Sequence, residues 1–276
     1  MGKILAKKNN GRGQETDNNV IQGLNHIIFK RQIPKFRIDI PIVNEYSLYL
    51  SEFSEKMPEF ASILNELRNA NPDDIIKIFI NSPGGCVSEG KAIINTLQSI
   101  GANIQTELIA HAYSMGALLF CIGDRRVIYE NSSIMFHNYS AGISGKGHEI
   151  EQRVIHLSEN LESFFKSILI GLTDEEIDSL IDGKDFWFSA KEMCQRGIAT
   201  HVVIDGITVT SEEYLKALKQ AKKRAKKQGL KISTLHEAYL QGIDEIEPLA
   251  AARENELQTI STQISAIVND HEFLYN

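Results

Sequence analysis

Apolar residues in the middle of the chain follow two spacings, one typical of strands and the other of helices. Residues 75–80 (IIKIFI) form a short and nearly continuous apolar run, which is expected of a buried strand. Residues 37–42 (RIDIPI) alternate between apolar and polar positions, which also favours a strand. By the same reasoning, further strands are predicted over residues 104–110, 126–129 and 134–137.

Between these strands, apolar residues recur every three or four positions, as on one face of a helix. Residues 52–69 suit an amphipathic helix, and a second helix after residue 87 should end at Gly101, a favourable C-cap. A longer helix is marked by an apolar stripe at Ile150, Val154, Leu157, Leu161, Phe165 and Ile168. Strands that alternate with crossover helices predict an α/β fold with mainly parallel pairing.

The chain divides into three segments of different charge and composition. Residues 1–34 are polar and basic and are predicted to form a mobile arm, residues 35–207 hold most of the predicted elements, and residues 208–276 form a helical extension. The net charge is −7, but residues 216–231 hold eight Lys or Arg and no acid. On a helix, such a run is more often a solvated or partner-docking face than a nucleic-acid site, and no interleaved aromatic residues support base stacking.

Composition excludes several classes of protein. With 276 residues, 42% of them hydrophobic and 24% charged, the chain is neither disordered nor collagenous. No apolar run approaches the roughly 20 residues of a membrane helix, and no secretory signal is visible. Three widely spaced cysteines indicate reduced thiols and not a disulfide framework or a zinc site. We therefore expect a cytoplasmic protein that does not associate with membranes.

Ser114 is a candidate nucleophile because it lies where a predicted strand gives way to a predicted helix. A hydroxyl at that position meets the positive end of the helix dipole and a group of free backbone N–H groups. Taken alone, the segment Ala112–Ala117 favours a simpler role, in which Ser114 is the N-cap of the helix. The G-x-S-x-G elbow of α/β-hydrolases is absent.

A serine nucleophile needs a base and a carboxylate that orients it. Among eight histidines, His137 ends a predicted strand, where sites gather in open α/β sheets. A lone histidine there would more often be a satisfied core residue, and His111 is a rival whose strand position does not direct it toward the Ser114 hydroxyl. Asp182 and Asp185 lie in one turn, and either could be only a turn or cap residue. Residues 81–85 (NSPGG) end a strand and can present backbone N–H groups to a cleft.

Together these segments resemble the proteolytic subunit of the Clp protease, a family of self-compartmentalised serine peptidases. The resemblance covers residues 36–206 and rests on four motifs in order: IKIFINSPGGCVSEGKAI at 76–93, AYSMGALLFCIG at 112–123, NSSIMFHNYSAGISGKGHEIE at 131–151 and DFWFSAKEMCQRGIATHVV at 185–203. It implies the family's fold of repeated β-β-α units, shared with crotonases, with a handle helix.

The resemblance also implies a set of catalytic residues. Ser114 matches the family nucleophile, with Tyr113 in place of a small residue, and His137 matches the histidine of the family's I-M-I-H-Q segment, in which Phe136 and Asn138 are local changes. Asp185 is preferred to Asp182 because it matches the aspartate four residues before the Ser-Ala pair. The backbone N–H groups of Gly85 and Met115 match those of the oxyanion hole. No metal or organic cofactor is implied.

Assembly and partners follow from the same resemblance. Residues 141–147 and the helix after them match the handle, which pairs substrate as an added strand and joins two rings, so polypeptide substrates and a homo-oligomer of stacked rings are implied. The family's axial loop, which helps engage a AAA+ unfoldase, is not recognisable in residues 1–50. The resemblance therefore implies peptidase chemistry more directly than an ATPase partner.

Other readings stay open from the sequence. A phage-encoded capsid-maturation peptidase on the same fold would also fit the unusual arms. A crotonase-like acyl-CoA enzyme would not need Ser114, His137 and Asp185 together. A non-catalytic ring subunit would be expected to lack one of these three residues, and none is missing.

Overall fold

The chain forms two compact units, residues 1–200 and 201–276. The computed structural model describes residues 5–7, 20–22, 28–32, 44–50, 64–65 and 67–272. The predicted strand over 37–42 and most of the predicted helix over 52–69 lie outside the described residues. The limits of the three predicted segments stay a prediction.

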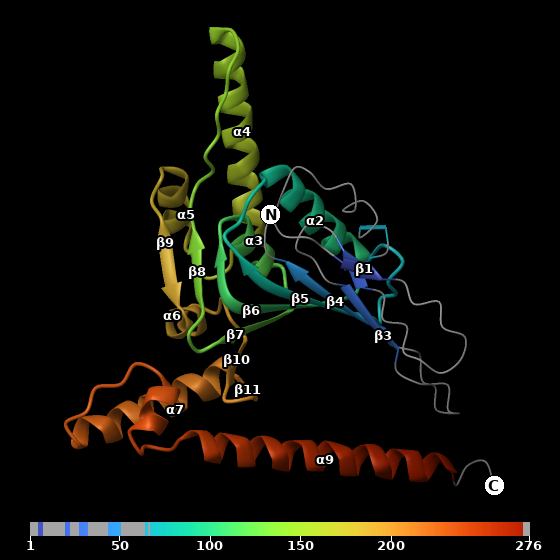
Figure 1. Ribbon diagram of the computed structural model, residues 1–276, viewed down its shortest axis with the longest axis vertical. Coiled ribbons are helices and arrows are strands. Elements are labelled where there is room, and N and C mark those ends of the chain that lie inside the picture. The colour runs from blue at the N-terminus through green and yellow to red at the C-terminus, as the bar shows by residue number, and fades with distance from the viewer. Residues whose placement is uncertain are drawn as a thin grey trace. The chain divides into compact units, whose positions relative to one another are not determined.

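A twisted sheet forms the centre of the first unit (Figure 1), with strand order β3-β4-β5-β6-β7. Its strands are β3 (Ile28–Gln32), β4 (Asn44–Leu50), β5 (Ile75–Ser82), β6 (Asn103–Tyr113) and β7 (Arg125–Tyr129). Strand β3 is antiparallel to β4, whereas β4, β5, β6 and β7 are parallel to their neighbours, as the alternation of strands and helices predicts. Two short strands, β1 (Leu5–Lys7) and β2 (Val20–Gln22), pair separately and antiparallel.

Strand β6 is long enough to have two different neighbours on one side. Residues 105–108 pair with β7, whereas residues 111–113 pair in parallel with β8 (Ser133–Phe136). Strand β8 in turn pairs antiparallel with β9 (Phe186–Ser189). The predicted strand over 104–110 therefore continues to Tyr113, and the branch formed by β8 and β9 begins beside this continuation.

Strand β5 forms where the apolar run predicts it, and it is buried on one face. Ile76, Ile78 and Ile80 are fully buried, but the residues between them are half-buried. Lys77 lies on the more open face, where its Nζ is 2.9 Å from a carboxylate oxygen of Glu45. An apolar run whose only charged residue has an ion-pair partner can thus border solvent.

Helices α2 (Val87–Ile100) and α3 (Met115–Cys121) pack on the sheet (Figure 1), and every residue of α3 is buried. Gly101 ends α2 with φ 74°, as its predicted role as a C-cap requires. The long helix α4 (Gly147–Ile168) extends away from the sheet. Its predicted apolar stripe is buried only in the carboxyl half, at Leu161, Phe165 and Ile168. Two short helices complete the unit, α5 (Asp174–Ile181) and α6 (Ala190–Gln195).

The second unit begins with a hairpin and continues as helices. Strands β10 (His201–Ile204) and β11 (Ile207–Thr210) are joined by Asp205 and Gly206, both at positive φ, as a two-residue hairpin turn requires. The helices are α7 (Ser211–Lys227), α8 (Leu235–Leu240) and α9 (Ile246–Glu272). Helices α7 and α8 pack together. No helix in the described part of the chain is long and apolar enough to span a membrane.

Candidate active site

Ser114 joins β6 to α3 in a backbone conformation that is unusual for serine. Its φ is 56° and its ψ is −125°, and among the described residues other than glycine only Asp205 shares a positive φ. The Ser114 amide donates to the Met135 carbonyl of β8 at 3.0 Å, and its carbonyl accepts from Ala117 at 3.0 Å. Conformations of this kind cost of order 1–3 kcal/mol and persist where neighbouring structure enforces them.

Ser114 occupies the N-cap position of α3, but its side chain makes no capping hydrogen bond. The simpler interpretation of the sequence, a serine that caps its helix, therefore does not account for the hydroxyl. A serine that is held at a strand-to-helix junction without a capping role keeps its hydroxyl available for chemistry.

The loop after β5 lies directly against Ser114. A Cβ atom on Gly84 would lie 2.6 Å from the Ser114 Cβ and 2.9 Å from the Tyr113 carbonyl oxygen. On the other side of the contact, a Cβ on Gly116 would lie 3.0 Å from the Cβ of the fully buried Ser82. The Ser82 hydroxyl accepts a hydrogen bond from the Gly84 amide at 3.1 Å, which fixes the loop that leads to Gly85. The close approach of these segments therefore requires glycine at both positions.

Sheet register brings the other two candidate residues to the same edge as Ser114. Strand β8 is parallel to β6 and ends one residue before His137, whereas β9 is antiparallel to β8 and begins one residue after Asp185. Phe136 pairs with Phe186, so one further step of this register sets His137 opposite Asp185. Neighbouring strands β6, β8 and β9 thus deliver serine, histidine and aspartate, in that order, to one edge of the sheet.

Hydrogen bonds between the side chains of these three residues are not formed among the described residues. Within the described parts of the chain, none links the Ser114, His137 and Asp185 side chains. Catalytic hydrogen bonds are often long in free enzymes and shorten when substrate binds. Their roles, and those of Gly85 and Met115, stay predictions that rest on strand register and backbone geometry.

Asn138 ties the histidine segment to the aspartate segment. Its Nδ2 donates to the Ile181 carbonyl at 2.7 Å, and its Oδ1 accepts from the Tyr139 amide at 2.8 Å. Ile181 ends α5, four residues before Asp185. Sequence reasoning noted Asn138 only as a departure from a motif, although its place directly after His137 was a signal that it could position the site.

Asp182 and Asp185 have different surroundings. Asp182 is the C-cap of α5, and its amide donates to the carbonyl of Asp178. Gly183 follows with φ 100°, which turns the chain toward β9. The end of a helix therefore explains Asp182, whereas Asp185 begins the approach to the strand that pairs with β8.

Comparison with known proteins decides the family. The sequence model described as "Clp protease" matches residues 48–206, more than half of the chain. Similar curated proteins include "ATP-dependent Clp protease proteolytic subunit 2" of Chlamydia trachomatis serovar D and "ATP-dependent Clp protease proteolytic subunit 1" of Chlamydia felis. Each is 33% identical over 141 residues, which cover 50% of this chain and 69% of the relative. The chain belongs to the Clp protease family.

Membership confirms the predicted fold class, the α/β fold of the Clp protease family with a helical C-terminal extension. It also implies a peptidase, that is, a hydrolase of peptide bonds. The family match ends at residue 206, so α7, α8 and α9 lie beyond it. In this Clp protease family member, the extension is the part whose role the family does not explain.

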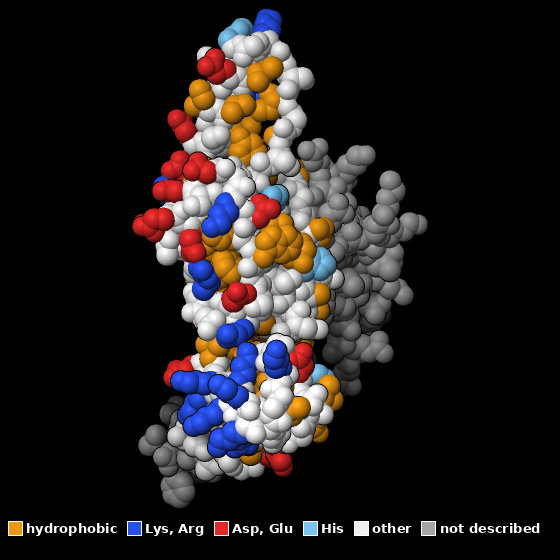
Figure 2. Space-filling model, turned by 90° about the vertical axis from the view of Figure 1, so that its left-hand side faces the viewer, with side chains coloured by type: hydrophobic (Ala, Val, Ile, Leu, Met, Phe, Trp, Pro, Cys, Tyr) orange, Lys and Arg blue, Asp and Glu red, His pale blue; other side chains and the backbone are white. Residues whose placement is uncertain are grey.

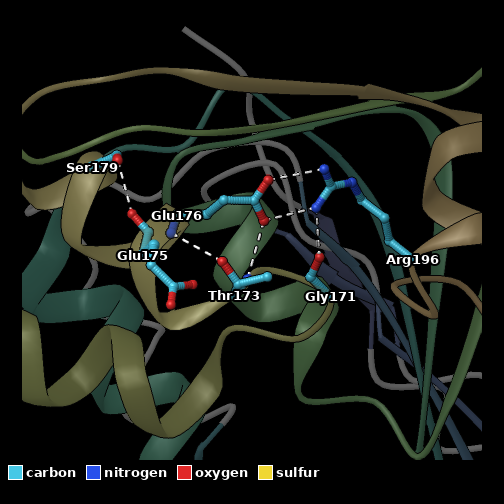
Figure 3. A network of polar contacts seen from close by, with 6 residues as sticks. All are labelled: Gly171, Thr173, Glu175, Glu176, Ser179 and Arg196. Carbon is cyan, nitrogen blue, oxygen red and sulfur yellow. Dashed lines mark hydrogen bonds and ion pairs between the residues drawn. The ribbon is translucent and has the colours of Figure 1, made fainter.

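Arg196 braces the segment that carries Asp185 (Figure 3). Its guanidinium donates to both carboxylate oxygens of Glu176, at 2.8 and 2.9 Å, and to the Gly171 carbonyl at 3.0 Å. Glu176 also accepts from the amide of Thr173, whose hydroxyl accepts in return from the Glu176 amide. Arg196, and then Thr173, lower the pKa of the Glu176 carboxyl below its ordinary value. Both ends of residues 171–196 are therefore held together.

His111, the other candidate base, contacts Tyr113. The His111 ring stacks on Tyr113 with centroids 4.8 Å apart, because residues two apart in a strand share a face. Tyr113 also meets the edge of Trp187 at 5.1 Å, and its hydroxyl hydrogen-bonds Ser133 at 3.0 Å. The His111 ring is therefore held against Tyr113.

Two cysteines near the sheet are poor nucleophiles. Burial raises the pKa of the Cys121 thiol to about 11. Burial, and next a hydrogen bond with Glu89, raise the pKa of Cys86, which follows Gly85 directly. Since the thiolate is the reactive form, both thiols are poorly reactive at neutral pH.

Proposed function

We propose that the chain is a serine endopeptidase whose triad is Ser114, His137 and Asp185. One observation carries the proposal: Ser114 is held at φ 56° without a capping bond, at the sheet edge where β8 ends before His137 and β9 begins after Asp185. Family membership supports peptidase chemistry. A crotonase-like acyl-CoA enzyme would leave this juxtaposition without a purpose.

In the proposed reaction, the Ser114 Oγ attacks the carbonyl carbon of a peptide bond while His137 accepts the hydroxyl proton. Asp185 orients the imidazole and stabilises its charged form. Collapse of the tetrahedral intermediate breaks the C–N bond, and His137 returns the proton to the leaving amine. Water then attacks the acyl-enzyme with His137 again as base, and this releases the acid and restores Ser114.

Backbone amides would stabilise the oxyanion. Met115 is the first residue of α3, so its N–H has no acceptor within the helix. Gly85, at φ 137°, continues the loop that packs against Ser114. Preorganised donors of this kind are typically each worth about 10²–10³ in kcat.

We further propose that the chain works as a cytoplasmic homo-oligomer of stacked rings and acts on polypeptides. Val154 and Ile155 support assembly, because these apolar side chains on α4 are 41% and 52% exposed. The relatives are named subunits of ATP-dependent proteases, which favours an ATPase partner for this chain too.

Labelling with a fluorophosphonate tests the nucleophile. The wild-type protein should be labelled at Ser114, and S114A should lose the label while its circular dichroism is unchanged. D185N should lower peptide hydrolysis by about 10⁴-fold through the wrong imidazole tautomer, whereas D182N should retain activity. Equal labelling of wild type and S114A would refute the proposal, and a larger loss in D182N would move the carboxylate to Asp182.

A further inference from the structure

Lysines form a row along one exposed face of α7, in the second unit. Figure 2 shows Lys and Arg side chains gathered over this part of the surface. The row, here called the lysine stripe, consists of Lys216, Lys219, Lys223, Lys226 and Lys227, all of them exposed. Successive turns of a helix bring residues three or four apart onto one side, so these ammonium groups lie in line.

The opposite side of α7 is anchored in the second unit. Its buried residues are Tyr214, Ala217, Leu218, Ala221 and Ala225. A capping box begins the helix, in which the Thr210 hydroxyl accepts from the Glu213 amide and the Glu213 carboxylate accepts from the Thr210 amide. The stripe is therefore presented on a helix whose orientation is fixed within its unit.

Other cationic residues of α7 interact with carboxylates of the second unit, whereas the lysines of the stripe do not among the described residues. Arg224 lies 3.0 Å from a carboxylate oxygen of Glu245, and Lys222 contributes to the lowered pKa of Glu237, after the Ser233 hydrogen bonds that are its main cause. No stripe lysine forms an ion pair with any residue in the described parts of the chain.

The helix dipole explains only part of the stripe. Cations in the last turn of a helix are stabilising, which accounts for Lys226 and Lys227. Lys216 and Lys219 lie in the first half of α7, where the dipole gives no such benefit. Like charges three or four residues apart also repel. Repulsion among these lysines therefore favours a role outside the fold.

We propose that the lysine stripe binds an acidic segment of the polypeptides that this chain cleaves. The inference rests on the proposed peptidase function and adds a substrate class to it. Lysine ammonium groups recognise carboxylates as point charges, without a fixed geometry. Such a surface selects for acidic composition and not for one particular sequence.

The dimensions of the stripe favour a polypeptide over a nucleic acid. Lys216 and Lys227 are about 16 Å apart along the axis of α7, a length that about five residues of extended chain cover. Exposed Glu212 and Glu213 bound the stripe at one end. A duplex carries a charge about every 1.7 Å and would continue past that boundary onto like charge.

The side chains of α7 also favour a polypeptide over a nucleic acid. Tyr214 is its only aromatic residue and is buried, so the exposed face has no ring on which a base could stack. Arg224, the only guanidinium on the helix, already binds a carboxylate, that of Glu245.

Capture by the stripe would raise the local concentration of substrate at the catalytic residues of the same chain. The effect belongs to binding, so it should lower KM for acidic substrates and leave kcat unchanged. It should also weaken as salt is added, because exposed charges are screened.

Binding is tested in full-length S114A, which cannot turn substrate over. The probe is a fluorescent peptide with a run of glutamates, followed by anisotropy. K219Q/K223Q should weaken binding about fivefold. The control is K191E, which makes the same change in net charge at an exposed position of α6 and should bind as the parent does. Equal binding by K219Q/K223Q and the parent would overturn the proposal.

Cleavage separates this inference from the proposed function. The otherwise wild-type enzyme should cleave a peptide with a glutamate run at lower KM than the same peptide with glutamines, and K219Q/K223Q should abolish the difference without lowering kcat. Cleavage of neither peptide would refute the peptidase itself. Cleavage of both with equal KM would overturn only the role of the stripe. Tighter binding of a single-stranded oligonucleotide of matched charge would also overturn it, in favour of a nucleic-acid surface.

Discussion

Gly84 and Ser114 share a space that admits no further side chain. An added Cβ at Gly84 would lie 2.6 Å from the Ser114 Cβ, and neither backbone segment can move without disturbing hydrogen bonds to Ser82 or Met135. The geometry of the loop that leads to Gly85 is therefore coupled to that of the proposed nucleophile. The backbone can take this conformation because Gly84 has no side chain.

We predict that G84A lowers kcat/KM for a short peptide by about 100-fold or more, because displacement of a reacting group by about 1 Å has that effect. The rate of fluorophosphonate labelling should fall with it. G101A is the matched control: Gly101 also has a positive φ, but an added Cβ would meet nothing within 4 Å. G101A should lose about 1 kcal/mol of stability and keep its activity. Full activity in G84A would contradict the coupling.

Asn138 connects two segments that strand register alone does not lock together. Its bond to the Ile181 carbonyl links the residue after His137 with the end of the helix before Asp185. We predict that N138A lowers kcat about tenfold with little change in KM, as expected when a base loses its orientation. The acidic limb of the pH–kcat profile should also move, since the imidazole and the carboxylate would no longer be held together.

Asn160 supplies the comparison for Asn138. It lies on the exposed part of α4, where its amide forms a hydrogen bond with His156 of the same helix. N160A should therefore leave kcat and the pH profile unchanged. If N138A lost thermal stability but kept both the wild-type kcat and its pH profile, Asn138 would be structural and not a positioning residue.

At the scale of elements, the candidate site depends on the ion pair of Arg196 with Glu176 as well as on the strands. Arg196 lowers the pKa of Glu176, so the ionised carboxylate stabilises the folded state. For a depressed carboxyl pKa, this contribution is complete above the ordinary value of about 4.3 and is lost as the pH falls through the lower value of the folded state.

We accordingly predict that wild type melts at a higher temperature than E176Q at pH 7 and that the two melting curves converge as the pH falls below about 4. Differential scanning calorimetry over that pH range measures the difference in melting temperature. E159Q is the control, at an exposed site on α4, and should follow wild type throughout. If the difference in melting temperature stayed constant down to pH 3, ionisation of Glu176 would not be what stabilises its contact with Arg196.

Local patterns in the sequence predicted most of these elements. Apolar spacing found β5, α2, α4 and β8, and Gly101 marked the end of α2, because each signal depends only on neighbouring residues. The end of β6 was placed three residues early, since His111 and Tyr113 are not typical of a buried strand. Their side chains lie on the more open face of the sheet, where such residues are tolerated.

The candidate site was predictable in its residues but not in its connections. The motif around Ser114 and the position of His137 were visible in the sequence, and family resemblance distinguished Asp185 from Asp182. The branch of β6 onto β8, the bond from Asn138 to Ile181 and the pair of Arg196 with Glu176 join residues 20 to 43 positions apart. Contacts at such separation depend on tertiary packing, which no local pattern encodes.

At the scale of the whole molecule, α4 carries apolar surface that the first unit does not cover. Leu157 of the predicted apolar stripe is half-buried, so its substitution would also test folding. Val154 and Ile155 are more exposed and make a cleaner test of assembly. Surface of this kind in a soluble protein marks an interaction site.

We predict that V154D lowers the sedimentation coefficient of the wild-type particle, because a charge in an apolar interface has no partner. S163D introduces the same charge at an exposed polar position of α4 and should assemble as wild type does. Analytical ultracentrifugation at micromolar concentration compares the three proteins. A wild-type protein that sediments as a monomer would contradict the role of α4 in assembly.

The positive φ of Ser114 also bears on the history of the chain. Glycine would adopt this conformation without strain, so selection for stability alone would replace serine at this position. A lineage released from catalysis could accept that substitution and gain a more stable fold. This chain has serine at that position, against the preference of its own backbone. The strain at Ser114 therefore favours a role of the hydroxyl other than stability.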